Sequence, residues 1–215
     1  NGSGDCRKTE QSAGTMCPSY HATKNEKDTT RARANMLREV LTQNDAANKF
    51  DSKELKEVFD LCIGCKACAT ECPSNVDMST AKAEFLYQYR KANGATTAEK
   101  LVAKSTYLNK QASKYPSIAN FLFTNSITSG IIKAQGNIAA KRTIPKVSSK
   151  SFGKILQNIE KQVFSKNKIL LFIDEFSNYL EAEIALDAYE LLSQLGYEIE
   201  VVHHLDSARA MISKG

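Results

Sequence analysis

Four closely spaced cysteines and a proline form one short stretch of the sequence: Cys62, Cys65, Cys68, Cys72 and Pro73. The spacing C-x2-C-x2-C-x3-C-P is the one with which proteins hold cubane iron–sulfur clusters. The first three thiolates can point into one small loop and bind three irons of one cube. In two-cluster proteins the fourth cysteine ligates the neighbouring cluster instead. Thiolate is the soft ligand that this chemistry requires, so the stretch predicts [4Fe–4S] binding.

Zinc is the main alternative for four close cysteines. Structural zinc sites commonly use two cysteine pairs, or Cys and His pairs, separated by a longer spacer. Here the cysteines form one compact run with no histidine near it in sequence. A zinc-stabilised structural or interaction domain without redox activity is therefore the second hypothesis. A disulfide framework is weaker still, because nothing else in the sequence suggests secretion.

Two further cysteines lie near the start of the chain, at Cys6 and Cys17, and residues 73–215 contain none. Cys17 is followed by Pro18, just as Cys72 is followed by a proline, which indicates a second, degenerate half-site. The metal chemistry visible in the sequence therefore belongs to the first third of the chain.

The composition is that of an ordinary globular protein. The chain has 215 residues, of which 42% are hydrophobic and 25% charged, and its net charge is +5. This modest positive charge fits a solvated surface, an acidic partner or an anionic membrane surface. The uncharged stretch 117–132 has 16 residues, fewer than the roughly 20 that span a membrane. The lysines of residues 97–166 are spread out without interleaved aromatic side chains, which argues against a nucleic-acid partner.

Helical periodicity predicts the elements that position the cysteines. A helix is expected from Thr29 or Thr30 to about residue 43, and a second from Asp51, with Glu54 in a capping-box-like position. The apolar face of the second helix continues to Cys62, which predicts that this cysteine points inward. A third helix is expected over residues 79–91. No alternating strand pattern occurs in residues 20–90, so the sequence predicts a helical, ferredoxin-like iron–sulfur domain over residues 1–95.

The rest of the chain is expected to form two further parts. Residues 96–166 predict a helical arm or linker, with a helix capped by Thr97, a break at Pro116 and a short helix over residues 152–163. Residues 167–215 predict the first part of an α/β domain. A strand over 169–173, a helix over 178–195 and a strand over 198–202 should form a βαβ unit with parallel strands. The predicted fold class is therefore mainly α, followed by the start of a βαβ domain.

Several motifs resemble one family. Residues 6–8, 15–23 and 30–35, together with the cysteine run, are similar to the iron–sulfur region of FAD-linked 2-hydroxy-acid dehydrogenases of the D-lactate, glycolate and D-2-hydroxyglutarate types. They also resemble the iron–sulfur subunit of anaerobic glycerol-3-phosphate dehydrogenase. Residues 142–145 and 172–179 resemble the linker and first strand of the cysteine-rich domain that follows in this family.

The resemblance implies a function for the chain and partners for it. An upstream FAD domain of the same full-length protein would oxidise a 2-hydroxy acid. The clusters of this segment would then pass electrons singly to an acceptor such as a quinone. The chain would by itself be an electron-transfer module of a cytoplasmic oxidoreductase, with peripheral association at the inner face of the membrane as one arrangement. No motif of a catalytic nucleophile or base is found. The histidines are not expected to take part, although a ligand role stays open for His21, four residues after Cys17.

The resemblance also implies the ligands of two clusters. Cys62, Cys65, Cys68 and Cys17 would hold one [4Fe–4S] cluster, and the second would use Cys72 and Cys6. In the family another cysteine usually stands a few residues before the position of Cys6, and here the sequence starts after that point. The second cluster is therefore expected to lack at least one ligand in this segment.

Overall fold

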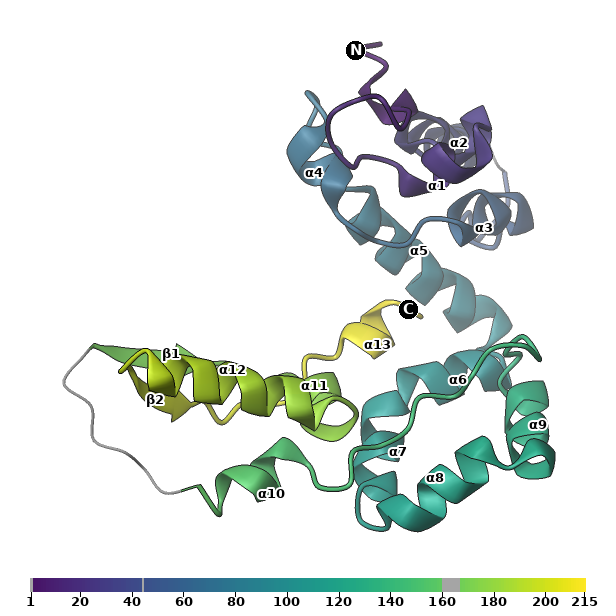
Figure 1. Ribbon diagram of the computed structural model, residues 1–215. Coiled ribbons are helices and arrows are strands. Elements are labelled where there is room, and N and C mark those ends of the chain that lie inside the picture. The colour runs from purple at the N-terminus through teal and green to yellow at the C-terminus, as the bar shows by residue number, and fades with distance from the viewer. Residues whose placement is uncertain (1, 44, 160–166) are drawn as a thin grey trace. The chain divides into compact units, whose positions relative to one another are not determined.

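The computed structural model describes residues 2–43, 45–159 and 167–215. The chain packs into two compact units, residues 1–95 with 212–215 and residues 96–211. Helices dominate both units, and one short parallel sheet lies in the second (Figure 1). The prediction of a mainly α fold followed by a βαβ unit is confirmed. The division into three parts (1–95, 96–166 and 167–215) stays a prediction.

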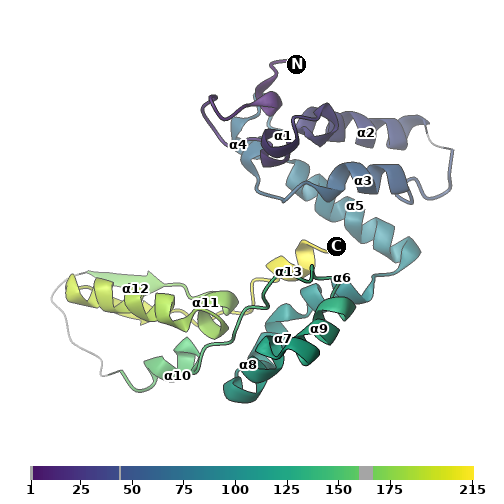
Figure 2. The ribbon, with the colours of Figure 1, turned by 45° about the vertical axis from the view of Figure 1, so that its right-hand side comes forward.

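The first unit is built from short helices around two longer ones. Its elements are η1 (Asp5–Arg7), α1 (Pro18–Thr23), η2 (Glu26–Asp28), α2 (Thr30–Gln43), α3 (Lys53–Asp60), α4 (Ala67–Glu71) and α5 (Met78–Asn93). Helix α2 packs against α3 and α5 (Figure 2). The expected helix up to residue 43 is confirmed, and the expected helix over 79–91 forms with one to two more residues at each end.

The core of the first unit lies where α3 meets α5. Leu55 and Phe59, one turn apart on α3, are completely buried, as is Phe85 of α5. The rings of Phe59 and Phe85 stack with centroids 5.4 Å apart. Their burial removes two large apolar side chains from water, the main favourable term in folding.

The boundaries of α3 differ from the prediction. The helix is capped by Ser52, whose hydroxyl accepts a hydrogen bond from the backbone N–H of Leu55 at 3.1 Å. The neighbouring Asp51 instead accepts a hydrogen bond from the side-chain amide of Asn93 at 2.7 Å. Because α3 ends at Asp60, Cys62 lies in the following loop rather than on the apolar face of the helix.

The second unit begins with four helices. These are α6 (Thr97–Ala103), α7 (Ser105–Ala112), α8 (Pro116–Thr124) and α9 (Ser126–Gln135), and α10 (Phe152–Leu156) follows them. The cap of α6 is Thr96, which forms a capping box with Glu99, and not Thr97 as predicted. Pro116 separates two helices as expected, and it does so as the first residue of α8, where its missing N–H is tolerated.

The βαβ unit completes the chain. It consists of β1 (Lys168–Leu171), α11 (Glu175–Tyr179), α12 (Ala182–Gln194), β2 (Glu198–Val201) and α13 (Arg209–Ile212), whose last residue belongs to the first unit. The strands pair in parallel, with Lys168 opposite Glu198. The single helix predicted over 178–195 is in fact two helices. The helix predicted over 152–163 is found for residues 152–156, and its residues 160–163 lie outside the described part.

The small core of the second unit joins α10 to α12. Its buried members are Phe152, Ala182, Ala185 and Tyr189. Phe152 and Tyr189 are in ring contact, with centroids 6.4 Å apart. Among the described residues, no helix is long and apolar enough to cross a membrane.

Candidate metal centre

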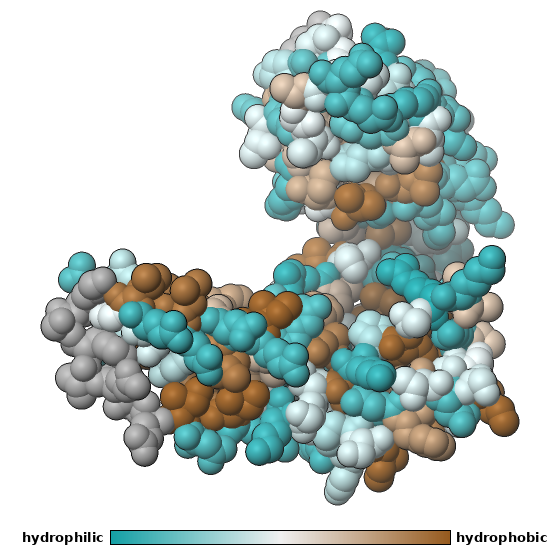
Figure 3. Space-filling model, in the orientation of Figure 1, coloured by the Kyte–Doolittle hydropathy of each residue, from teal (hydrophilic) through white to brown (hydrophobic). Residues whose placement is uncertain are grey.

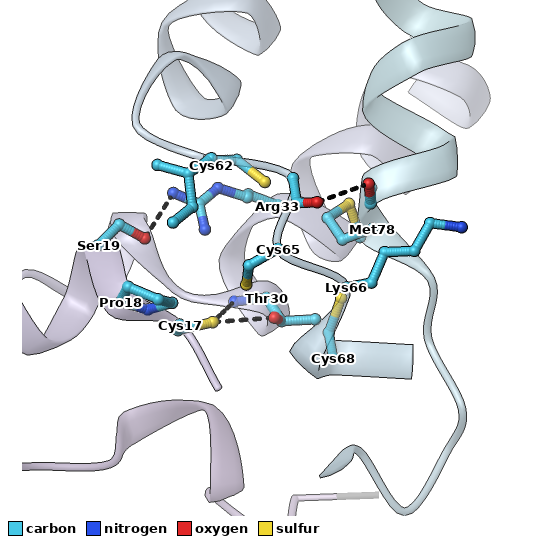
Figure 4. Close-up of a pocket in the computed structure, with 13 residues that line it drawn as sticks. Cys17, Pro18, Ser19, Thr30, Arg33, Cys62, Cys65, Lys66, Cys68 and Met78 are labelled. Atoms are coloured by element: carbon cyan, nitrogen blue, oxygen red, sulfur yellow. Dashed lines mark hydrogen bonds between the residues drawn. The ribbon is translucent and has the colours of Figure 1, made fainter. Parts of the chain in front are cut away.

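Four cysteines from two distant stretches of the chain line one pocket of the first unit: Cys17, Cys62, Cys65 and Cys68 (Figure 4). Cys17 directly precedes α1, and Cys68 lies in the first turn of α4. The other two belong to the loop that joins α3 to α4. The fold therefore brings a cysteine from near the chain start against three cysteines of the C-x2-C-x2-C stretch.

Left-handed backbone conformations shape this pocket. Cys17 has φ of 57°, Gly64 of 67° and Lys66 of 61°. Glycine adopts such values without strain, whereas a residue with Cβ does so at a cost and is uncommon there. The loop between Cys62 and Cys68 contains two of these turns, at Gly64 and Lys66, and its cysteines line one pocket.

The thiol of Cys17 is held by Thr30, the first residue of α2. The backbone N–H of Thr30 donates to Sγ of Cys17 at 3.0 Å, and the Thr30 hydroxyl lies 2.9 Å from the same sulfur. Burial raises the pKa of the Cys17 thiol, and the bonds from Thr30 and the charge of Arg33 oppose that rise. Hydrogen bonds to a cysteine sulfur also favour its anionic form and act on the potential of a cluster that it binds.

Two cations, Arg33 and Lys66, line the pocket, and a third, Lys82, contacts its loop from α5. Arg33 lines it and is only 2% exposed. Lys82 of α5 donates from Nζ to the carbonyl oxygens of Phe59 at 2.7 Å and Cys62 at 2.6 Å. No motif or periodicity predicts a role for Lys82, which lies 20 residues from Cys62 in sequence. Lys66, at the centre of the loop, is instead exposed and forms an ion pair with Asp77 at 3.4 Å.

A second pocket of the same unit contains the remaining two cysteines, Cys6 and Cys72. Cys6 is buried within η1, and Cys72 follows α4 directly. Arg31 and Asn35 of α2 also line this pocket. The last cysteine of the C-x2-C-x2-C-x3-C stretch thus faces a different space from the first three.

Glu71 ties the two Cys-Pro segments together. Its carboxylate accepts hydrogen bonds from the backbone N–H of Thr15 at 2.8 Å and of Met16 at 3.1 Å, and pairs with Lys8. The bond from Lys8 and then that from Thr15 lower the pKa of Glu71 to about 2. Because Glu71 precedes Cys72 and Met16 precedes Cys17, these bonds hold the segments of the two cysteines together. Gly14, with φ of 93°, leaves room for the contact, since a Cβ there would overlap the Glu71 carboxylate and the Lys8 ammonium.

The donor set of the first pocket fits an iron–sulfur cluster. Its lining holds four thiols and no Asp, Glu or His side chain, and all six cysteines of the chain are free. Among the described residues, no three Cys, His, Asp or Glu side chains lie close enough together to hold one metal ion. In a cubane each thiolate binds a different iron, so its ligands surround a body larger than one ion. His21 is not part of either cysteine pocket.

Comparison with known proteins gives the same cofactor. Residues 1–77 match the family model of the 4Fe-4S dicluster domain. The chain is 25% identical to a D-2-hydroxyglutarate dehydrogenase of Haemophilus influenzae and 24% identical to one of Pantoea ananatis. Each alignment covers 100% of this chain and 25% of the relative, so the chain spans about a quarter of the length of these curated proteins. No solved structure matches the chain.

These matches confirm the [4Fe–4S] cofactor and the resemblance to the FAD-linked 2-hydroxy-acid dehydrogenases that the motifs carry. Residues 1–77 match the family model of the 4Fe-4S dicluster domain, and the whole chain is similar to a segment that makes up about a quarter of each D-2-hydroxyglutarate dehydrogenase.

Proposed function

We propose that this chain relays electrons through [4Fe–4S] clusters from an FAD domain of the full-length protein, which oxidises a 2-hydroxy acid, to an acceptor such as a quinone. The observation that carries the proposal is the pocket lined by Cys17, Cys62, Cys65 and Cys68. A bound [4Fe–4S] cluster supplies one-electron chemistry, and the protein sets its potential through ligands, hydrogen bonds, charge and burial. No step of substrate chemistry is assigned to the residues of this chain.

We propose the first pocket as the site of one cluster, with Cys17, Cys62, Cys65 and Cys68 as its ligands. Cys72 and Cys6 are proposed as ligands of the second cluster. The separation of the six cysteines into two pockets, four in one and two in the other, supports this division. The Glu71 contacts support it further, because they hold the Cys17 and Cys72 segments beside each other.

The flavin domain and the substrate follow from the relatives. These relatives are D-2-hydroxyglutarate dehydrogenases, and this chain spans only about a quarter of their length. A protein of that length has ample sequence for a flavin domain. The full-length protein is therefore proposed to be an FAD-linked 2-hydroxy-acid dehydrogenase, placed in the cytoplasm with its clusters near the inner face of the membrane.

Binding to an anionic membrane surface would bring the chain to a quinone, and the charge distribution supports it. Residues 96–154 contain ten Lys or Arg and a single acid, Glu99, which gives this stretch +9 in a chain of net +5. The same stretch exposes large apolar side chains among hydrophilic ones (Figure 3), including Tyr107, Tyr115, Ile118, Phe121, Ile127 and Ile131. Basic residues with exposed apolar side chains are typical of surfaces that bind anionic lipid.

Charge reversal at Lys110 and Lys114 should weaken binding to vesicles that contain anionic lipid at least tenfold. Each lysine near such a surface is worth about 1 kcal/mol. The measurement is cosedimentation with vesicles of mixed neutral and anionic phospholipid, against neutral vesicles alone. The matched control reverses Lys53 and Lys91, two exposed lysines outside residues 96–154. Equal binding of both double variants, or equal binding to neutral vesicles, would contradict membrane attachment through this stretch.

The electron-transfer proposal is tested by anaerobic purification, iron and sulfide analysis, and EPR of the dithionite-reduced protein. Between about four and eight irons per chain, with matching sulfide and an S = 1/2 signal, is the expected result for one or two clusters. Zinc without sulfide would overturn the electron-transfer function and favour the structural alternative.

A further inference from the structure

Arg33 is a buried cation whose hydrogen bonds reach only neutral oxygens. Its Nε donates to the carbonyl oxygen of Val58 at 3.0 Å, and its Nη2 donates to the hydroxyl of Ser19 at 3.0 Å. Within the described residues, no carboxylate forms an ion pair with its guanidinium. A buried charge without a partner of opposite sign is strongly unfavourable, so such groups are nearly always paired.

Lys82 adds a second positive charge to the same region. Its ammonium bonds to two backbone carbonyls and, among the described residues, to no carboxylate. The two cations therefore repel each other across the wall of a pocket whose lining contains no acid. The residues that line the pocket therefore include no carboxylate that could balance the Arg33 guanidinium.

We propose that Arg33 is the counter-charge of the cluster in the first pocket and that it raises the reduction potential of that cluster. The inference rests on the proposed function. A [4Fe–4S] cluster with four thiolate ligands is an anion in both of its working oxidation states. The guanidinium lies among the cysteines of the pocket (Figure 4), where an anion would compensate it.

The direction of the effect follows from the charge balance of reduction. One electron enters the cluster, and its negative charge increases by one. A fixed positive charge in a buried site of low dielectric stabilises the reduced form more than the oxidised form. Arg33 therefore moves the equilibrium toward reduction, which favours uptake of electrons from a donor. Arg33 is a positioning and tuning residue, since its bonds go to Val58 and Ser19 rather than to any cysteine.

The test compares Arg33→Gln and Arg33→Lys with Arg38→Gln, an exposed arginine of the same helix. In an EPR-monitored redox titration, Arg33→Gln should decrease the ratio of reduced to oxidised cluster at least tenfold at a fixed potential. This corresponds to 59 mV for a one-electron couple. Arg33→Lys keeps the positive charge and should shift the reduction potential much less. Arg38→Gln should have the reduction potential of the wild type.

Thermal unfolding of cluster-loaded and cluster-free protein gives a second readout. If Arg33 balances the charge of the cluster, Arg33→Gln lowers the unfolding temperature of the cluster-loaded protein. The unfolding temperature of the cluster-free protein stays unchanged or rises. If Arg33 served only to hydrogen-bond Val58 and Ser19, its replacement would lower both unfolding temperatures equally. That result, together with an unchanged reduction potential, would overturn the proposal. A wild-type chain that takes up zinc without sulfide would instead overturn the proposed function, and this inference with it.

Discussion

Replacing Cys17 with serine is expected to remove the cluster of the first pocket, whereas Cys72→Ser leaves that cluster in place. Cys17 lines the first pocket with Cys62, Cys65 and Cys68, although 45 positions separate it from Cys62 in sequence. Cys72 lies within the cysteine-rich stretch but lines the second pocket. Serine nearly preserves the side-chain shape and removes the soft thiolate ligand. The measurement is iron and sulfide per chain after anaerobic purification, with EPR of the reduced protein.

Cys17→Ser should hold about four irons per chain fewer than the wild type, the content of one cube, and should lose the EPR signal of the first cluster, which Cys72→Ser should keep. Cys6→Ser is the matched control, because it faces the second pocket and should behave like Cys72→Ser. The opposite pattern, with cluster loss in Cys72→Ser and retention in Cys17→Ser, would show that the four cysteines of the stretch hold one cluster together. The exchange of Cys-Pro cysteines between the two sites would then be wrong.

The cysteine pattern could be predicted from the sequence because ligand spacing is a local property. The C-x2-C-x2-C run needs one loop, and the two Cys-Pro pairs are visible by inspection. The surroundings of the thiols depend on tertiary packing. Lys82 reaches the Cys62 carbonyl from another helix, and Glu71 reaches Thr15 across 56 positions of sequence. Neither contact has a periodicity or a motif that could reveal it.

The helices were predicted better than their ends. Apolar periodicity marks the middle of a helix, but a cap is decided by which of two adjacent polar residues adopts an extended backbone. Ser52 takes that place in α3 and Thr96 in α6, each one residue from the predicted cap. The break between α11 and α12 has another cause. There the carbonyl oxygen of Tyr179 accepts a hydrogen bond from the backbone N–H of Ser148, a partner far away in sequence.

Truncation of Phe59 to alanine should destabilise the first unit by about 3–5 kcal/mol, the usual loss for a buried phenylalanine. Phe59 is completely buried and stacks on Phe85, so its removal leaves a cavity between α3 and α5. A single domain is stable by only about 5–15 kcal/mol, and this loss is a large share of that total. The loop from Cys62 to Cys68 should become less ordered too, since the Phe59 carbonyl accepts hydrogen bonds from Lys82 and from the N–H of Cys62.

Hydrogen exchange followed by mass spectrometry measures this change in each unit separately. With Phe59→Ala, the amides of α2, α3 and α5 should exchange faster, and those of α12 should not change. Phe152→Ala is the matched control, because Phe152 is equally buried and lies in the core of the second unit. It should accelerate exchange in α10 and α12 and leave α3 protected. If either substitution accelerated exchange in both units to the same extent, the chain would unfold as one cooperative body. The units on either side of residue 95 would then not unfold independently.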